Sequence, residues 1–168
     1  MKHYGNLPRL ENFQAYRPSA AALRAARERH VELPDTLTRG QRTASWICCG
    51  MAAAIMLETL PFKFSGAMES VYIFSKMGTE PWMRWVQGSW ELLAAVCLLT
   101  PRLRWAGAIL GTGAMGAAIL SHLTWLGFSV QGDHGLLFCM ALTAFTGSFT
   151  ALILHRHSVP FITPLSYW

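Results

Sequence analysis

Apolar residues fill four long stretches after residue 42, and short polar segments separate them. The stretches are residues 43–60, 82–100, 105–128 and 135–154. A helix that crosses the hydrocarbon core of a membrane needs about 20 mostly apolar residues, so each stretch predicts one transmembrane span. Pro61 and Pro101 follow the first two stretches, and we expect the helices to end there. The pattern therefore predicts an all-α fold, a bundle of four transmembrane helices.

A shorter apolar segment, residues 68–77, lies between the first two predicted spans. Its composition favours a helix that lies along the outer membrane surface. Gly78 ends this helix, and Glu80-Pro81-Trp82 begins the next one with proline in its first turn. In the third span, small residues recur at three- and four-residue spacing, which predicts that neighbouring helices approach closely.

Residues 1–42 precede the bundle and form a separate cytoplasmic segment. They lack the apolar core of a signal peptide. Residues 1–18 predict an extended arm, and residues 19–33 predict a basic helix that Pro34 ends. This helix could lie in water or against lipid headgroups, or the segment could dock on a partner subunit. The side chains expected to dock are Tyr4, Phe13, Tyr16, Arg24 and Arg27. Residues 43–157 form the predicted transmembrane domain, and residues 158–168 form a C-terminal tail.

The composition agrees with a membrane protein. The chain has 168 residues, of which 52% are hydrophobic and 14% are charged, which is too apolar for an ordinary soluble domain. A net charge of +5 would suggest nucleic acid in a soluble chain, but eight of the fourteen lysines and arginines precede Thr43. This excess is a topology signal, so we expect no nucleic-acid partner and place both termini in the cytoplasm. The predicted location is the cytoplasmic (inner) membrane of a bacterium.

The four cysteines form no CxxC pair, because Cys48 and Cys49 are adjacent while Cys97 and Cys139 stand alone. All four lie in apolar stretches, and free cysteine is often simply buried. We therefore expect small core residues and disfavour dithiol exchange.

Short motifs follow one another in order through the predicted bundle. They are PFKFSG at 61–66, ES at 69–70, EPW at 80–82, GSWEL at 88–92, LLTPR at 98–102, SHLT at 121–124 and GD at 132–133. With this ordered set, residues 43–160 resemble the DoxX-like family of four-span membrane proteins. The resemblance implies a compact four-helix bundle. For some members it implies a membrane subunit of oxidoreductase systems, including thiosulfate to quinone electron transfer and thiol or oxidative-stress complexes. The first forty residues go beyond the usual family pattern.

Seven ionisable residues lie in or beside the apolar stretches, where a charge is costly unless it is paired or faces water. At about 1.5 Å of rise per residue, Glu91 lies roughly 14 Å and His122 about 9 Å below the outer surface. We expect all seven in the outer half of the bundle, and nothing comparable in the inner half. The seven residues are Glu58, Lys63, Glu69, Arg84, Glu91, His122 and Asp133.

Two main interpretations of this cluster stay open. In the first, it is structural: Glu91 and Glu58 pair with Lys63 or Arg84, and His122 hydrogen-bonds the network. In the second, the cluster lines an outward-facing pocket for a quinone, a small thiol or sulfur species, or a proton in transit. Glu91 and His122 would then handle protons, and Lys63 and Arg84 would polarise a carbonyl or hold an anion. The pocket walls would be Trp82, Trp85, Trp90 and Trp125. A metal or haem site, which would need His134 brought to His122, is disfavoured.

No nucleophile, base and acid set is evident, and no cofactor is predicted beyond the quinone of the second interpretation. The sequence therefore predicts an accessory subunit of a larger membrane complex of redox or energy-converting type, docked through residues 1–42. The alternative is a quinone-linked oxidoreductase component.

Overall fold

The computed structural model describes residues 19, 21 and 37–159, and the statements below concern these residues. The chain divides into two units, residues 1–36 and 37–168, and the bundle belongs to the second. The five predicted docking side chains and nearly all of the predicted helix at 19–33 lie outside the described residues. The end of the chain from residue 160 also lies outside them.

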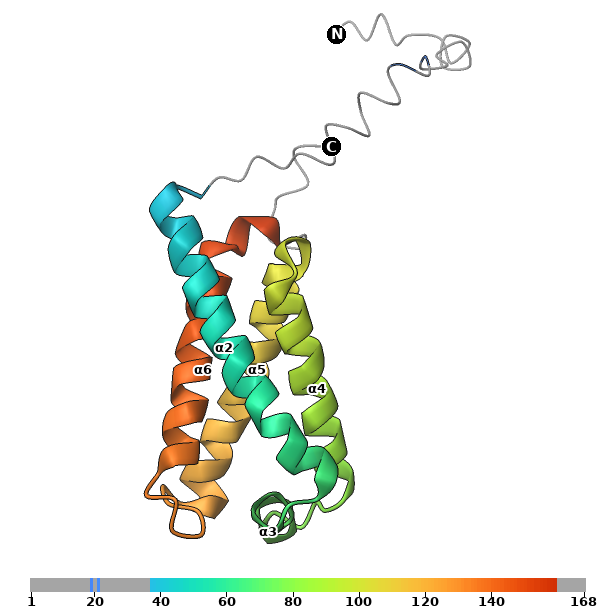
Figure 1. Ribbon diagram of the computed structural model, residues 1–168, viewed down its shortest axis with the longest axis vertical. Coiled ribbons are helices and arrows are strands. Elements are labelled where there is room, and N and C mark those ends of the chain that lie inside the picture. The colour runs from blue at the N-terminus through green and yellow to red at the C-terminus, as the bar shows by residue number, and fades with distance from the viewer. Residues whose placement is uncertain (1–18, 20, 22–36, 160–168) are drawn as a thin grey trace, which may run out of the picture. The chain divides into compact units, whose positions relative to one another are not determined.

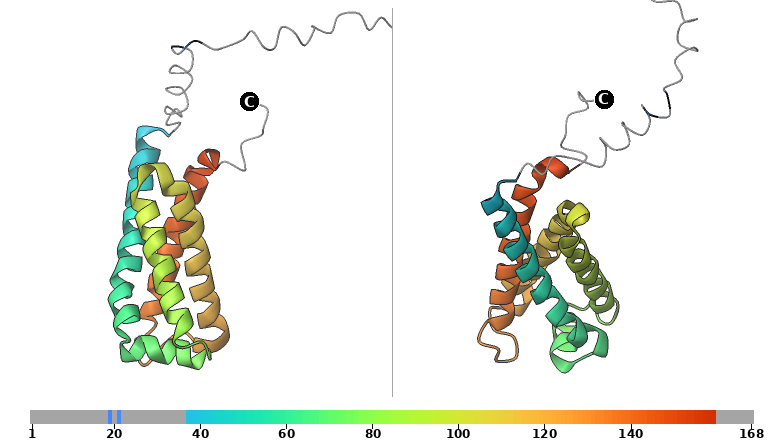
Figure 2. Two further views of the ribbon diagram at one scale, coloured as in Figure 1. Left: turned by 90° about the vertical axis from the view of Figure 1, so that its right-hand side faces the viewer. Right: turned by 45° about the horizontal axis from the view of Figure 1, so that its top comes forward.

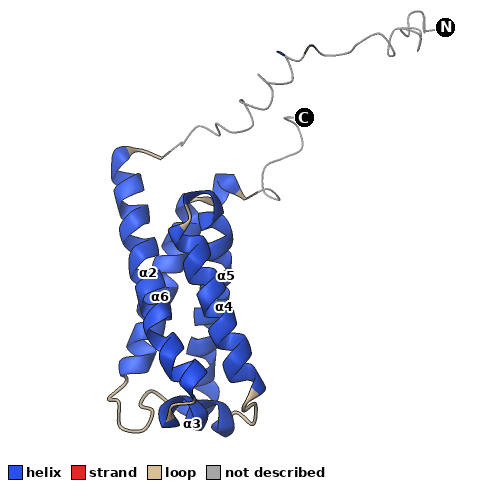
Figure 3. Ribbon diagram, turned by 45° about the vertical axis from the view of Figure 1, so that its right-hand side comes forward, coloured by secondary structure: helices blue, strands red, loops and turns tan. Residues whose placement is uncertain are grey.

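Four long helices pack side by side in the second unit (Figure 1). They are α2 (Arg39–Ser65), α4 (Trp82–Leu99), α5 (Arg104–Ser121) and α6 (Leu136–Leu154). Helices α2 and α5 each pack against both α4 and α6. The described part of the chain contains helices and loops but no strand (Figure 3). The all-α prediction is confirmed.

The bundle has two ends of different construction. At one end, the short helix α3 (Met68–Lys76) lies across the helices, beside the π-helical turn η3 (His122–Leu126) (Figures 1 and 2). We call this the α3 end. The other end holds the start of α2, the 3₁₀ turns η2 (Pro101–Leu103) and η4 (Arg156–Ser158), and the end of α6. We call it the η2 end.

Three segments are long and apolar enough to cross a membrane: Arg39–Ser65, Pro101–Leu126 and Leu136–Leu154. Helix α4 has 18 residues, but its first ten include Arg84, Gln87 and Glu91, which lower its apolar character. By length and composition, three of the four predicted spans are therefore candidates to cross a membrane, and α4 is not among them.

Helix α2 differs from its prediction at both ends. It begins at Arg39 rather than Thr43, because Thr38 and Gln41 form a reciprocal capping box. It also runs through Pro61 to Ser65 and ends at Gly66, whose φ of 72° is left-handed. The expectation that the chain leaves the helix after Pro61 is wrong. A proline removes one helical hydrogen bond, but the extra turn places Lys63 against Glu91 and Phe64 against Gly88.

Small residues let the helices approach closely, as predicted. A Cβ atom added at Gly107 would lie 2.4 Å from the Leu98 nitrogen, and one at Gly111 would lie 2.6 Å from Ser148 Oγ. On α6, a Cβ atom at Gly147 would lie 2.9 Å from the Cys48 carbonyl oxygen of α2. A larger residue at these positions would push the helices apart.

The expectation for the cysteines holds in part. Cys49 and Cys97 are buried and Cys48 is half-buried, but Cys139 is exposed. The prediction that all four are core residues is therefore wrong for Cys139, which lies on an outward face of α6. An apolar segment alone does not reveal which face of its helix meets the bundle.

Candidate ligand cavity at the α3 end

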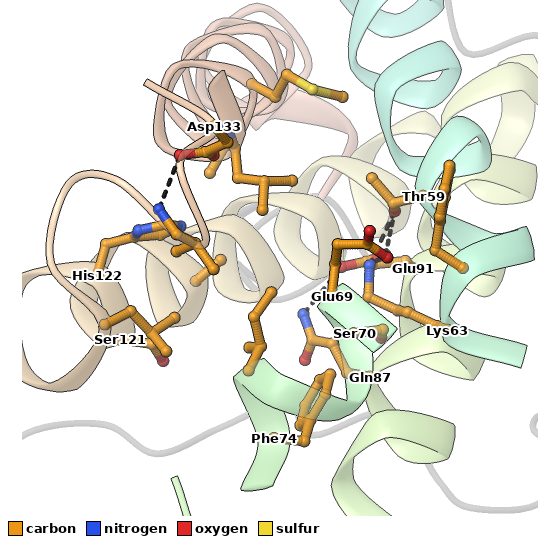
Figure 4. Close-up of a pocket in the computed structure, with 18 of the residues that line it drawn as sticks. Thr59, Lys63, Glu69, Ser70, Phe74, Gln87, Glu91, Ser121, His122 and Asp133 are labelled. Carbon is orange, nitrogen blue, oxygen red and sulfur yellow. Dashed lines mark hydrogen bonds and ion pairs between the residues drawn. The ribbon is translucent and has the colours of Figure 1, made fainter. Parts of the chain in front are cut away.

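A cavity of about 650 Å³ opens among the helices at the α3 end. Side chains from α2, α3, α4, α5 and α6 line it, as do the turn η3 and the loop before α6. Its walls are mostly apolar, with polar groups from separate elements (Figure 4). Six of the seven predicted residues line this cavity: Glu58, Lys63, Glu69, Glu91, His122 and Asp133.

The Lys63–Glu91 ion pair connects α2 to α4 at the wall of this cavity. Lys63 Nζ lies 2.7 Å from Glu91 Oε2 and donates to Thr59 Oγ1 at 2.8 Å. The Thr59 hydroxyl donates to the same Glu91 oxygen at 3.0 Å, and Gln87 Nε2 donates to the other oxygen at 3.1 Å. Only 3% of the Glu91 side chain is exposed. Each carboxylate oxygen therefore has at least one donor, which offsets the cost of burying the charge.

This geometry confirms the predicted pairing of Glu91 with Lys63, and it adds two partners that the sequence interpretation missed. Gln87 stands four residues before Glu91, and Thr59 stands four residues before Lys63. Residues at that spacing lie on one face of a helix, so helical spacing could have identified both.

Arg84 lies outside the cavity lining, and its predicted pairing with Glu91 or Glu58 is wrong. Its guanidinium instead binds Glu80, with Nη2 at 2.8 Å and Nε at 2.9 Å from Oε1. Nη1 also donates to the Lys63 carbonyl oxygen. Arg84 therefore fastens the start of α4 to the last turn of α2. Glu58 is exposed, and no ion pair to it occurs among residues 37–159.

His122 is buried, but the expectation that it hydrogen-bonds the Lys63–Glu91 network is wrong. Its Nδ1 lies 2.8 Å from the Gly127 carbonyl oxygen. A carbonyl can only accept, so Nδ1 carries the proton, and in the neutral ring Nε2 is then an acceptor. The π turn permits this contact. The Gly127 N–H donates to the His122 carbonyl at 2.9 Å, which brings the Gly127 backbone close to the His122 side chain. The ring packs edge-on against Phe138.

Asp133 organises the loop before α6. Its carboxylate accepts from the backbone N–H groups of Val130 at 2.7 Å, and of Gly135 and Leu137 at 2.9 Å each. Burial alone raises the pKa of this carboxyl, but these three bonds and one from Ser129 outweigh it and hold the pKa below its usual value. Asp133 is thus a positioning residue for one wall of the cavity.

The four tryptophans predicted as pocket walls point elsewhere. Trp82, Trp85, Trp90 and Trp125 are all exposed, and none lines the cavity. The three tryptophans on α4 are exposed on the outside of the bundle, where an indole suits a membrane interface. Five methionines line the cavity in their place: Met56, Met77, Met83, Met115 and Met140. Methionine side chains are flexible and adapt to ligands of varied shape, but no sequence spacing pointed to them.

The η2 end holds polar groups that the sequence interpretation did not expect. Arg104 is buried, and its guanidinium carbon lies 3.6 Å from the ring centroid of Trp46. Ser45 Oγ lies 2.7 Å from His155 Nε2. The expectation of nothing comparable in the inner half is wrong, because the helix faces that carry these residues turn inward at the η2 end.

Within the part of the chain that the structure describes, no group of three or more His, Cys, Asp or Glu side chains could hold a metal ion. Comparison of the chain with protein-family models, curated proteins and solved structures found no match.

The ion pair can be tested by a double-mutant cycle on Lys63→Met and Glu91→Gln. Lys63→Met leaves a buried carboxylate without its cation, and we expect a loss of about 3–5 kcal/mol in the free energy of unfolding. The double variant should lose less than the sum of the single losses. Reversible unfolding in detergent micelles measures the cycle, with Glu58→Gln as an exposed control of near-zero effect. Additive single losses would show that the pair is not coupled.

Asp133→Ala removes the acceptor of three backbone N–H groups, and we expect a loss of about 1 kcal/mol near neutral pH. Because the folded pKa is lowered, this stabilisation is complete above the unfolded pKa of about 3.9. It disappears as the pH falls through the folded pKa. Unfolding measured between neutral and acidic pH should show wild type and variant converging in acid. A difference that stays constant down to strong acid would contradict this role.

Proposed function

We propose that this chain is an integral membrane protein whose cavity binds a lipophilic carbonyl compound of the quinone class. The observation that supports this most is a largely apolar cavity of about 650 Å³ with an ion pair and a histidine in its walls. Small-molecule sites typically have volumes of about 300–1,000 Å³, apolar walls and a few placed polar groups. The methionines and other apolar side chains would hold the ring and the first part of a hydrocarbon tail.

Two polar groups would orient the ring. The Lys63 ammonium has three N–H donors and, among the described residues, two acceptors, Thr59 and Glu91, so one donor would be available to a ligand carbonyl. His122 donates from Nδ1 to the Gly127 carbonyl, so Nε2 would accept a hydrogen bond from a ligand hydroxyl when the ring is neutral. A reduced ring bears the hydroxyl groups that this acceptor needs. Thr59, Gln87 and Glu91 keep the Lys63 head in place.

The proposal includes four membrane spans, with α4 as the fourth. At about 1.5 Å per residue, its 18 residues cover about 27 Å, close to the hydrocarbon thickness. Its charged side chains are buried in the bundle, with Arg84 and Glu91 at 7% and 3% exposure. The exposed large side chains of α4 are apolar: Trp82, Met83, Trp85, Val86, Trp90, Leu92, Leu93, Val96 and Leu99. Helix α3 would lie at the outer surface, and both termini would be cytoplasmic in a bacterial inner membrane.

The resemblance to the DoxX-like family favours a place in a redox complex. Within it, the chain would be an accessory subunit that holds a quinone beside a catalytic partner. Residues 1–42 would provide the contact with that partner.

Quinone binding should depend on His122. His122→Asn keeps a short side chain that can reach the Gly127 carbonyl but removes the Nε2 acceptor. We expect about tenfold weaker binding of a short-chain benzohydroquinone, the equivalent of about 1.4 kcal/mol. Binding is measured by calorimetry on the full chain in nanodiscs. His134→Asn, an exposed loop position outside the cavity, is the matched control. Equal affinity in wild type and His122→Asn, or no binding to wild type, would contradict the proposal.

If the chain is an accessory subunit, mild detergent solubilisation of its native membrane should release it as part of a larger assembly. A variant that lacks residues 1–40 should instead migrate as the small protein alone in native gel electrophoresis. Wild type that migrates alone under mild solubilisation would rule out this part of the proposal.

A further inference from the structure

Arginines gather at the η2 end within the described part of the chain. The described segments of this end, residues 37–50, 97–107 and 148–159, contain no Asp or Glu. The acidic residues of the described chain lie elsewhere, from Glu58 to Asp133, and those that line the cavity belong to the α3 end. The arginines of the η2 end are Arg39, Arg42, Arg102, Arg104 and Arg156.

Among these arginines, Arg104 is buried and has a guanidinium nitrogen that lacks an acceptor among the described residues. It is only 4% exposed, and it stacks on Trp46. Its Nε donates to the Leu98 carbonyl at 3.3 Å, and its Nη2 is buried with no hydrogen-bond partner among the described residues. Arg104 is also the first residue of α5, where the helix dipole adds positive potential. Burying a cation costs desolvation free energy, and an anion bound to the guanidinium would offset that cost.

We propose that Arg104 binds the phosphate of an anionic lipid headgroup. The planar guanidinium presents paired N–H donors that match two phosphate oxygens. Trp46 is 47% exposed, and a tryptophan with one exposed edge is typical of the headgroup level. Arg102, exposed on the preceding turn, adds attraction for the same charge. The guanidinium stacks on Trp46 and donates to the Leu98 carbonyl, and a side-chain rotation that breaks this 3.3 Å bond would bring it to the headgroup.

A lipid is favoured over other anions because of where Arg104 lies. The inference rests on the membrane placement proposed above, which puts the η2 end at the cytoplasmic surface. Anionic lipids are concentrated in that leaflet, and basic pockets between transmembrane helices bind their headgroups. The shared chemistry is a phosphate oxyanion, so free phosphate is the competing source.

The experiment measures the melting temperature of the full chain in a neutral detergent, with and without added phosphatidylglycerol. We expect a rise of about 5 °C or more for wild type at saturating lipid. Arg104→Gln should lose the rise, and Arg104→Lys should lose most of it because lysine lacks the planar fork. Arg39→Gln, an exposed arginine at the start of α2, is the control and should keep most of it. Phosphatidylcholine should give no comparable rise.

Three results would overturn the proposal. They are an equal rise in Arg104→Gln, an equal rise with phosphatidylcholine, and the same rise with inorganic phosphate alone. If Arg104→Gln does not fold, the Arg104→Lys comparison decides. Benzohydroquinone binding is measured on the same samples. If wild type binds benzohydroquinone but shows no rise in melting temperature with phosphatidylglycerol, the lipid site is rejected and the proposed function is not.

Discussion

Glu91 is a carboxylate buried between apolar helices, and its pairing with Lys63 is the interaction on which the α3 end depends. Removing one partner of such a pair costs about 3–5 kcal/mol, because the other charge stays buried. The pair exists only because α2 continues through Pro61 to the left-handed Gly66. The same last turn supplies the carbonyl that Arg84 binds. One extra helical turn therefore joins α2 to α4 twice and fixes one wall of the cavity.

The helices were largely predictable, because length and apolar composition decide where they occur. The predicted segments 82–100 and 135–154 agree with α4 and α6 to within one residue at each end. The end of α2 was not predictable in the same way. A proline usually ends a helix, and the contacts that carry α2 past Pro61 come from α4, far away in the sequence.

The sequence predicted which ionisable residues line the cavity but not which residues pair with one another. Charges in apolar sequence pointed to six residues that line the cavity. Depth alone could not choose between Lys63 and Arg84 as the partner of Glu91, since both lie near the same end. The choice depends on which way each side chain turns from its helix. For the same reason, the tryptophans were placed on the wrong face, and the buried Arg104 was missed.

We propose that a quinone-class molecule binds in the cavity beside Lys63 and His122. Photo-cross-linking with an azidoquinone, followed by peptide mass spectrometry, tests it most directly. We expect labelling of cavity-lining segments around Met115 and Met140, and excess unlabelled quinone should reduce it. Labelling confined to the exposed side of α4 around Trp85 and Trp90, or labelling that excess quinone does not reduce, would show that the cavity does not bind quinone.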